Sequence, residues 1–428
     1  MEKNNKKTIN GWAFYDWANS VYPLVVTTAI FPIFYEAVTS TKNSAGEVIS
    51  DTVSLFGYNF VNTELYTYTI AMSFLIVSAI SPLLSGLADY IGDKKRFLQF
   101  FCYLGASACA SLFFFDTAYL GISMLLIMLT SIGFWGSLVF YNAYLPEIAT
   151  TDLHDKISAK GYGLGYIGSS LLLIALLVAI QVFGMPAKWS FVITGLWWAG
   201  FAQITYSRLP KKVQGIKPKA NLLNGFQELN KVLKQLKELT TLKRYLRAFF
   251  IYSMGVQTVM LMATLFGKKE IMGMPDSGLI ISVLLIQFVA VGGAYLFSWV
   301  SKKIGNVQAL IIAVLMWVGI CIAAYFIYTP IGFYALAGVV GLVMGGIQSL
   351  SRSTYSKLIP VETKDTASFF SFYDVTEKIG IVIGMFAYGA IEALTGSMRN
   401  SVLALIVFFA LGLILLLLVP RKRVLENA

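Results

Sequence analysis

Long apolar blocks separated by short polar stretches run along the whole chain of 428 residues. A helix needs roughly 20 apolar residues to cross a hydrocarbon core about 30 Å thick, and most of these blocks reach that length. Spanning β-strands would show strict alternation of apolar and polar residues instead of solid blocks. The pattern predicts twelve spanning helices, near residues 10–38, 64–90, 97–115, 118–145, 160–183, 188–207, 244–266, 277–301, 307–328, 331–355, 366–395 and 400–420.

The composition agrees with a membrane-embedded chain. Hydrophobic residues make up 57% of the sequence and charged residues only 13%, whereas a water-soluble domain is about a quarter charged. The net charge of +11 does not indicate nucleic-acid binding, because the basic residues stand between apolar blocks and form no patch interleaved with aromatic residues. We therefore expect an integral, multi-pass protein of the bacterial cytoplasmic membrane, with the lipid bilayer as its solvent.

The basic residues also predict the orientation. If both termini are cytoplasmic, 27 of the 33 Lys and Arg residues fall in cytoplasmic segments. Cytoplasmic loops carry such an excess of positive charge.

A polar central stretch divides the twelve helices into six and six. The sequence thus predicts a six-helix bundle over 1–207, a cytoplasmic linker over 208–243, and a second six-helix bundle over 244–428. Within the linker, Phe226, Leu229, Leu233 and Leu236 recur at helical spacing and predict a basic amphipathic helix. That helix would either lie on the inner leaflet or cap the cytoplasmic ends of the bundles.

A faint internal repeat supports two related halves. The segment FYNAYLP (140–146) is similar to TYSKLIP (354–360). Tyr141 corresponds to Tyr355 and Pro146 corresponds to Pro360, at a constant offset of 214 residues. This offset is half of the chain, as expected for two parallel six-helix repeats.

The most specific motif is GLADYIGDKKR (86–96), in the turn after the second predicted helix. It resembles the cytoplasmic loop signature of the major facilitator superfamily, except that Tyr90 stands where the signature has arginine. The resemblance implies the major facilitator fold, and it implies a gating role for the matching residues, which are Gly86, Asp89, Gly92, Lys95 and Arg96. The corresponding turn at 299–306 keeps Gly305 but has Lys302 in place of the acid.

Three further segments are similar to the vacuole effluxer-like family, also called the unidentified major facilitator family. They are GWAFYDWANSVYP (11–23), FYNAYLPEIATTDLHDKISAKGYGLGYIGS (140–169), and the pair GGIQSLSRSTYSKLIP (345–360) and FFSFYDVTEKIG (369–380). The resemblance covers most of the chain and implies export, with neutral amino acids as the first candidate substrates. The fourth predicted helix has no arginine and the fifth lacks the proline of drug antiporters, which disfavours that class.

Charged residues inside the membrane are costly and are the first candidates for function. Asp16 lies about 10 Å into the first helix, on one face with Asn19 and Pro23. No basic residue lies within that helix beyond its N-terminal flank, so we expect Asp16 to carry a proton or to anchor a substrate amine. The alternative is that Asp16 only helps the helices to assemble.

A second charged cluster lies in the eleventh helix. Asp374 and Lys378 are spaced for an ion pair, which leaves Glu377 without a partner. Arg352, at the end of the tenth helix, is the nearest basic candidate for Glu377, and we expect these residues to act in gating or coupling.

Other polar and aromatic residues stand on helices that would line a central cavity. Together with Asp16 and Asn19, those expected along the substrate or proton pathway are Tyr22, Trp135, Tyr141, Asn142, Tyr252, Gln257 and Gln348.

No cofactor or metal site is expected. The chain has one histidine, His154, which we expect to be solvated, and its three cysteines lie inside apolar blocks without metal-ligand spacing. No nucleophile triad or phosphate-binding loop is present, so the sequence does not indicate an enzyme.

The sequence therefore predicts a monomeric secondary transporter that exports a small organic solute by alternating access, with protons as the candidate coupling ion. Two alternatives stay open: an exporter of another amphipathic metabolite or drug, and a membrane sensor that does not transport.

Overall fold

The computed structural model describes residues 3–42, 48–210 and 222–420. It is almost entirely helical, as expected from the sequence. The first half of the chain contains the helices α1 (Lys6–Asn19), α2 (Phe31–Thr39), α3 (Asn62–Ile91), α4 (Lys94–Ser111), α5 (Leu120–Ala143), α6 (Leu145–Ile148), α7 (His154–Gln181) and α8 (Trp189–Arg208). The second half contains α9 (Leu222–Glu238), α10 (Thr240–Glu270), α11 (Asp276–Ile304), α12 (Asn306–Phe326), α13 (Pro330–Leu358), α14 (Thr366–Thr395) and α15 (Met398–Leu417).

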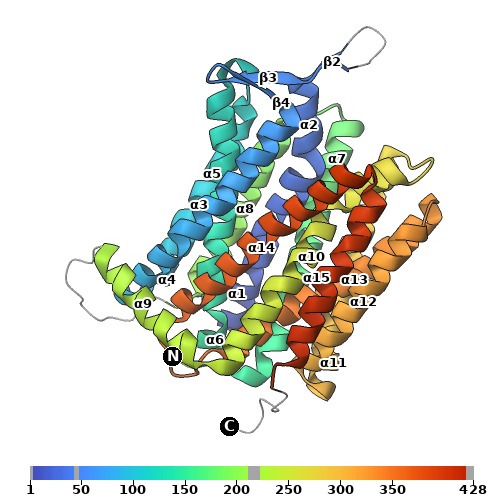
Figure 1. Cartoon of the computed structure of the whole chain (residues 1–428). Coiled ribbons are helices and arrows are strands. Elements are labelled where there is room, and N and C mark those ends of the chain that lie inside the picture. The colour runs from blue at the N-terminus through green and yellow to red at the C-terminus, as the bar shows by residue number, and fades with distance from the viewer. Residues whose placement is uncertain (1–2, 43–47, 211–221, 421–428) are drawn as a thin grey trace.

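The long helices pack into two groups (Figure 1). Helices α1, α3, α4, α5, α7 and α8 contact one another, and so do α10 to α15. The two groups meet where α3 and α5 contact α14 and where α7 contacts α11 and α13. The domain boundaries at 207 and 243 agree with this grouping but stay predictions.

Eleven helices in the described part of the chain are long and apolar enough to cross a membrane. The twelfth expected span, at 188–207, is present as α8 but is not among the eleven. Its indole, tyrosine and glutamine side chains make it less apolar than the others, and it packs against α1 and α4. The count of twelve spans therefore stays a prediction.

The first predicted helix is not a continuous α-helix. After α1, a π-helical segment, η1 (Tyr22–Ile30), begins one residue before Pro23 and leads into α2. Proline removes a backbone donor, and π-helical turns commonly relieve such a break. The α-helix is thus interrupted at Pro23.

Two small β-hairpins connect α2 to α3 and were not expected. Strands β1 (Thr41–Lys42) and β2 (Val48–Ser50) pair, as do β3 (Thr52–Leu55) and β4 (Tyr58–Val61), both antiparallel. They lie at one end of the helical body, away from the N-terminus (Figure 1). We call this the hairpin end, and we call the opposite end, which carries the α3–α4 turn and α9, the basic end.

Glycines let neighbouring helices approach closely within each half. A Cβ atom added to Gly133 of α5 would lie 2.3 Å from Gly105 of α4. In the second half, a Cβ atom on Gly293 of α11 would lie 2.0 Å from the carbonyl oxygen of Leu342 in α13. Close packing through small residues is how helices associate in lipid, where burial of apolar surface gives no drive.

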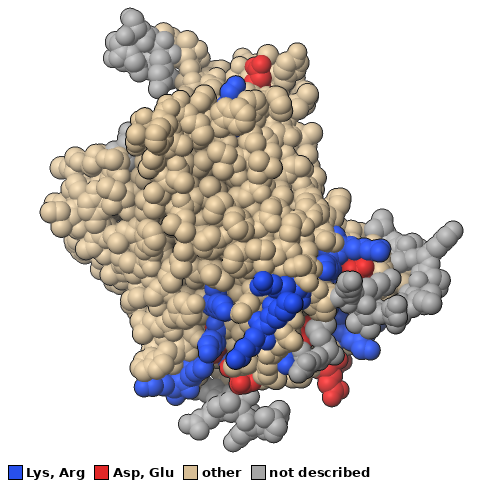
Figure 2. Space-filling model, turned by 180° about the vertical axis from the view of Figure 1, so that it is seen from behind, with Lys and Arg blue, Asp and Glu red and all other residues tan. Residues whose placement is uncertain are grey.

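Charge is segregated along the long axis. Figure 2 shows a broad band without exposed charge, and lysine and arginine side chains gather below it at the basic end. This distribution is typical of a spanning protein whose basic end is cytoplasmic.

We therefore expect a reporter fused after Ala428 to be cytoplasmic, because the excess of Lys and Arg sets the orientation. Paired phosphatase and fluorescent-protein fusions at this position would measure it. Phosphatase activity outside the cell, without fluorescence, would reverse the assigned orientation.

The linker helix α9 lies against α3 and also contacts α10 and α14. Its buried residues are Gly225, Val232 and Leu236, whereas Phe226 and Leu233 are exposed. The predicted apolar stripe was therefore partly wrong, because α9 turns a neighbouring line of side chains toward α3.

Candidate functional site

An ion pair between α1 and α13 lies at the junction of the two halves. Both terminal nitrogens of the Arg352 guanidinium donate to Oδ2 of Asp16 at 3.1 Å. The Tyr141 hydroxyl donates to the same oxygen at 2.8 Å. Arg352 is 2% exposed and Asp16 is 5% exposed, so both charges are removed from bulk water and depend on each other.

Helix α7 completes the surroundings of Arg352. The Nε atom of Arg352 donates to the hydroxyl of Ser158 on α7 at 2.9 Å, and its Nη2 atom donates to the Ser158 carbonyl oxygen, also at 2.9 Å. The guanidinium lies over the Tyr162 ring at 4.2 Å and over the Trp12 ring at 4.9 Å. Arginine stacks favourably on aromatic faces, so this enclosure fixes the position of the charge as well as neutralising it.

The glycines of the segment 161–168 explain how α7 can come so close to α1. A Cβ atom on Gly161 would lie 2.3 Å from Oδ2 of Asp16, and one on Gly165 would lie 2.4 Å from the Ser20 hydroxyl. Any larger residue at Gly161 would occupy the space of the ion pair.

This pair corrects two expectations. Asp16 is not a carboxylate without a cationic partner, and Arg352 does not pair with Glu377. The sequence places Arg352 at a helix end, but α13 continues to Leu358, so Arg352 lies within the helix and faces α1. Which helix faces which could not be inferred from one sequence.

The second charged cluster lies on α14. Lys378 Nζ is 2.9 Å from Asp374, the pair predicted from their spacing, and also 2.9 Å from Glu377. Gln257 of α10 donates to Glu377 at 2.9 Å. The ammonium lies 3.6 Å from the centre of the Trp135 ring on α5, so this cluster also spans the two halves.

The α14 cluster has one more carboxylate than ammonium. Oδ2 of Asp374 is buried and has no hydrogen-bond partner among the described residues. A buried carboxylate oxygen without a donor is costly, so this atom is a place where a proton or a substrate donor would be stabilised.

A neutral contact also links the two halves. The Tyr166 hydroxyl of α7 donates to Gln348 of α13 at 2.5 Å, and Gln348 reaches Met260 of α10. Three of the expected pathway residues, Trp135, Gln257 and Gln348, thus take part in contacts near the junction.

Other expected pathway residues are placed differently. Asn142 accepts from Arg352 at 3.4 Å and belongs to the ion-pair site. Asn19 is buried, and its amide nitrogen has no partner among the described residues. Tyr22 packs on Phe134 inside the first half, and Tyr252 bonds to Ser351 inside the second half. Neither tyrosine joins the two charged clusters.

Asp89 forms a contact between the halves at the basic end. It accepts hydrogen bonds from the backbone nitrogen and the hydroxyl of Ser368, each at 2.7 Å, at the N-terminus of α14. The positive end of a helix dipole favours such an acid. Lys94 lies 3.3 Å from Asp89 and also bonds to Glu147 and Thr366.

The remaining motif residues support the turn and its packing. Gly92 ends α3 in the left-handed conformation, with φ of 72°. Gly86 allows the backbone of α9 to approach, since a Cβ atom there would lie 2.2 Å from the Gly225 oxygen. Lys95 donates to the carbonyl oxygen of Tyr206 at the end of α8, and Arg96 pairs with Asp93 in the same turn. Lys94, which was not among the predicted gating residues, is the motif lysine that contacts Asp89 and Thr366.

A second contact at the basic end was missed from the sequence. Asp155, in the first turn of α7, accepts from Lys357 at 2.6 Å, from Asn306 at 2.7 Å and from Ser301 at 2.9 Å. The turn after α11 has no acid of its own, and the carboxylate of its contact, Asp155, is supplied by the opposite half.

Replacing Asp89 by asparagine should slow transport several-fold and leave folding nearly unchanged. Asparagine can keep one acceptor for Ser368 but loses the charge that faces Lys94 and the helix N-terminus. Folding is little affected because Lys94 keeps Glu147 as its anionic partner. Transport rate and melting temperature of the purified variant would measure this, with Asp93→Asn in the same turn as the matched control. Equal rates for Asp89→Asn and the parent would show that the motif is only structural.

The hydrogen bonds and ion pairs between the two halves of the described chain are confined to the part of the molecule nearest the basic end. They extend from the basic end to the Tyr166–Gln348 contact, about 18 Å into α7. The structure is therefore the conformation in which the basic end is closed.

The described residues contain no group of three or more His, Cys, Asp or Glu side chains that could hold a metal ion. The expectation that His154 is solvated was wrong. It is 1% exposed at the start of α7, because this helix begins six residues earlier than expected and lies against the body of the protein.

Comparisons with known proteins agree with this architecture. The family model described as "Vacuole effluxer Atg22 like" matches residues 4–428. An uncharacterised MFS-type transporter of Bacillus subtilis, YxiO, is 32% identical over 99% of this chain and 97% of its own length. The autophagy-related protein 22-1 of Penicillium rubens is 23% identical over 98% of this chain and 91% of its own.

Solved transporters share the fold. The structure of FucP in the outward conformation superposes with a TM-score of 0.68 at 13% identity, covering 97% of this chain and 98% of that one. The human organic anion transporter MFSD10 gives 0.70 at 12% identity, covering 96% and 98%. The sequence relatives and the fold of the present chain are those of transporters and not of enzymes. The chain therefore belongs to the vacuole effluxer-like family of major facilitator transporters.

Proposed function

We propose that this protein is a secondary transporter that exports a small zwitterionic solute, with neutral amino acids as the first candidates. The observation that carries the proposal is the pair of buried charge clusters at the junction of the two halves, Asp16 with Arg352 and Asp374 with Glu377 and Lys378. Charges inside a membrane protein are expensive and mark the pathway of a polar substrate or ion.

The two clusters suit a zwitterion. An amino acid presents a carboxylate and an ammonium group on one carbon. The junction offers an anion on the first half, and cations and anions on the second half. The substrate carboxylate can be bound by the cations Arg352 and Lys378. The substrate ammonium can be bound by one of the carboxylates, which are Asp16, Asp374 and Glu377. Binding at such a site would exchange protein ion pairs for substrate ion pairs without leaving a buried charge unpaired.

Alternating access then requires the basic end to open. Opening must separate Asp89 from the N-terminus of α14, and Asp155 from Lys357. Both contacts are made of hydrogen-bonded charges that water can replace, so they can break and re-form at modest cost. A rocking motion of the halves about a site near the midplane is the mechanism that the fold supports.

Binding is tested first by a thermal-shift screen of the purified protein against amino acids and other metabolites. A ligand that binds only the folded state at about 100 times its Kd adds about 2.7 kcal/mol to the unfolding free energy. A neutral amino acid that raises Tm would support the proposal. A response only to larger amphipathic compounds would favour the alternative, an exporter of another metabolite or drug.

Asp16→Asn separates two roles for this carboxylate. If Asp16 carries the coupling proton, the variant should lose pH-driven accumulation by at least about tenfold and keep substrate exchange. If Asp16 anchors the substrate ammonium, the same change should weaken binding at every pH, by about 1.5–3 kcal/mol for a charged hydrogen bond.

Uptake with and without a pH gradient, together with Kd at several pH values, measures both roles. Glu36→Gln, which makes the same acid-to-amide change at an exposed position of α2, is the matched control. Wild-type affinity together with wild-type pH dependence in Asp16→Asn would assign Asp16 to packing alone.

We further propose that the protein acts as a monomer in the bacterial cytoplasmic membrane with its basic end inside. The similarity to a Bacillus transporter and the segregation of charge support this location. A sensor that binds a solute without moving it is the remaining alternative class.

A further inference from the structure

The linker helix α9 has more apolar surface than its contacts with the protein cover. Gly225, Val232 and Leu236 are buried against the body, and Leu229, which follows them around the helix, is half-buried. The apolar surface then continues outward through Leu233 and Phe226. Phe226 is 55% exposed and Leu233 is 36% exposed.

The position of α9 places this outer apolar strip beside the bilayer. Gly225 packs against the backbone of Leu83 and Leu87 in α3. These residues lie eight and four positions before the end of α3 at Ile91, or about 6–12 Å along the helix. The N-terminal part of α9 is therefore level with the last turns of a spanning helix and does not project beyond it.

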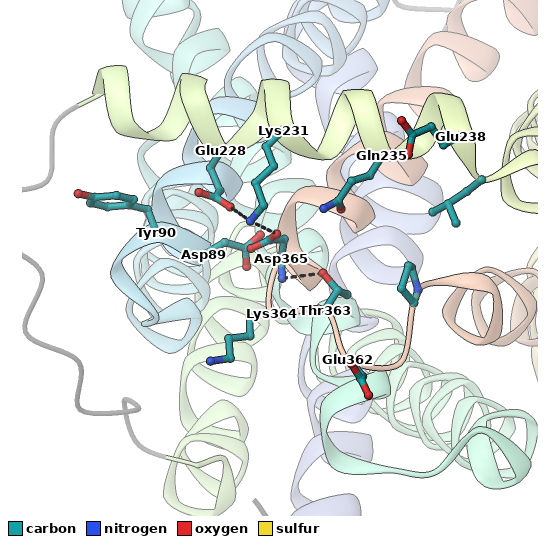
Figure 3. Close-up of a pocket in the computed structure, with 12 residues that line it drawn as sticks. Asp89, Tyr90, Glu228, Lys231, Gln235, Glu238, Glu362, Thr363, Lys364 and Asp365 are labelled. Atoms are coloured by element: carbon teal, nitrogen blue, oxygen red, sulfur yellow. Dashed lines mark hydrogen bonds and ion pairs between the residues drawn. The ribbon is translucent and has the colours of Figure 1, made fainter. Parts of the chain in front are cut away.

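The next side chains around α9 are basic. Lys237, Asn230 and Lys234 follow the apolar strip, and all three are exposed. Polar residues then continue to Lys231, on the side that faces a pocket of about 620 Å³ between α9, the end of α3 and the α13–α14 loop (Figure 3). The order around the helix is protein contact, apolar strip, lysines and aqueous pocket, which is the order expected for a helix lying in a membrane interface.

We propose that the outer face of α9, defined by Phe226, Leu233, Lys234 and Lys237, docks on the anionic lipids of the leaflet at the basic end. The apolar strip enters the boundary between headgroups and acyl chains, and the two lysines meet lipid phosphates. Charge complementarity selects this occupant, since lysines at a membrane surface attract anionic headgroups.

Docking here would act on the closed gate. On the inner side of α9, Lys231 donates to Asp365 at 2.8 Å and to Glu228 at 2.6 Å. Asp365 directly precedes α14, the helix whose N-terminus binds Asp89. These hydrogen bonds, the one to Asp365 first, raise the pKa of Lys231 above its ordinary value, so its charge persists. A leaflet that holds α9 in place therefore also stabilises the link that α9 makes between α3 and the N-terminus of α14.

The first test places a nitroxide at residue 226 or 233 of the full chain, with the three buried cysteines replaced, in phosphatidylcholine vesicles with and without phosphatidylglycerol. In the anionic vesicles we expect both positions to be accessible to oxygen and protected from a water-soluble nickel chelate. A nitroxide at Gln227, on the polar side of the same turn, is the matched control and should be open to nickel. Equal nickel access at 226, 233 and 227 would overturn the proposal.

The second test measures lipid preference. Each lysine near an anionic surface contributes about a fivefold preference, so Lys234→Gln with Lys237→Gln should lose most of an about 30-fold preference for phosphatidylglycerol over phosphatidylcholine. Lipid retained by the detergent-purified protein gives this ratio. Lys234→Arg with Lys237→Arg, which keeps both charges on α9, is the control and should change it little.

An unchanged preference in the variant with two glutamines, or the same loss in the control with two arginines, would contradict the proposal. A disulfide cross-link between two chains of the Phe226→Cys variant would show that a second copy, and not lipid, covers this face. Both tests are independent of transport, so their failure would leave the proposed function intact.

Discussion

Arg352→Gln should abolish transport and lower the free energy of unfolding by about 3–5 kcal/mol. The variant leaves the Asp16 carboxylate buried with only the Tyr141 hydroxyl as a strong donor, and it empties the aromatic enclosure formed by Trp12 and Tyr162. An unpaired buried charge costs far more than the pair contributes. Substrate flux into proteoliposomes and the midpoint of unfolding in mild detergent would measure the two effects.

A double variant separates folding from function. Asp16→Asn with Arg352→Gln removes both charges and should recover most of the lost stability, because no buried charge remains. It should still fail to transport if the pair belongs to the substrate or coupling pathway. Recovery of transport in the double variant would show that the pair only fastens α1 to α13.

Lys378→Met should also abolish transport, and it should destabilise the protein by several kcal/mol. The change leaves Asp374 and Glu377 close together on α14, with only Gln257 donating to either of them. The two neighbouring carboxylates then repel each other without the ammonium that offsets this repulsion in the parent. The methionine keeps the apolar stem against Trp135 but cannot replace the charge.

The pH dependence of stability measures this effect. The parent and Lys378→Met should converge at low pH, where the carboxylates are protonated, and diverge as pH rises. Lys302→Met, an exposed lysine near the end of α11, is the matched control and should change stability by no more than about 0.5 kcal/mol. A pH-independent difference between Lys378→Met and the parent would mean that lost packing, and not unpaired charge, accounts for the effect.

The spans were the most predictable part of this protein. Blocks of apolar residues are a direct consequence of the bilayer's thickness, and each predicted helix has a helical counterpart in the structure. The departures are local. Pro23 accompanies a π-helical segment, and the residues before α3 form hairpins outside the apolar blocks, where hydropathy carries little information.

The partners of the buried charges were less predictable. Spacing within one helix correctly paired Asp374 with Lys378, because neighbours four apart share a helix face. It could not pair Asp16 with Arg352, which are separated by more than 300 residues and meet only when the two halves close.

The second contact at the basic end was hidden for a related reason. The turn after α11 lacks an acid, and the compensating carboxylate, Asp155, belongs to the other half of the chain. A search for the motif within the second half alone therefore could not find this contact, because its acid stands in the first half.

The central claim is that this junction moves a solute across the membrane, and counterflow tests it most directly. Proteoliposomes are loaded with the ligand that raises Tm, and entry of labelled ligand against this load is followed over time. We predict rapid, saturable entry with the parent protein and none above empty liposomes with Arg352→Gln. Stabilisation by the ligand without counterflow in the parent would contradict the account and would identify a receptor that binds but does not transport.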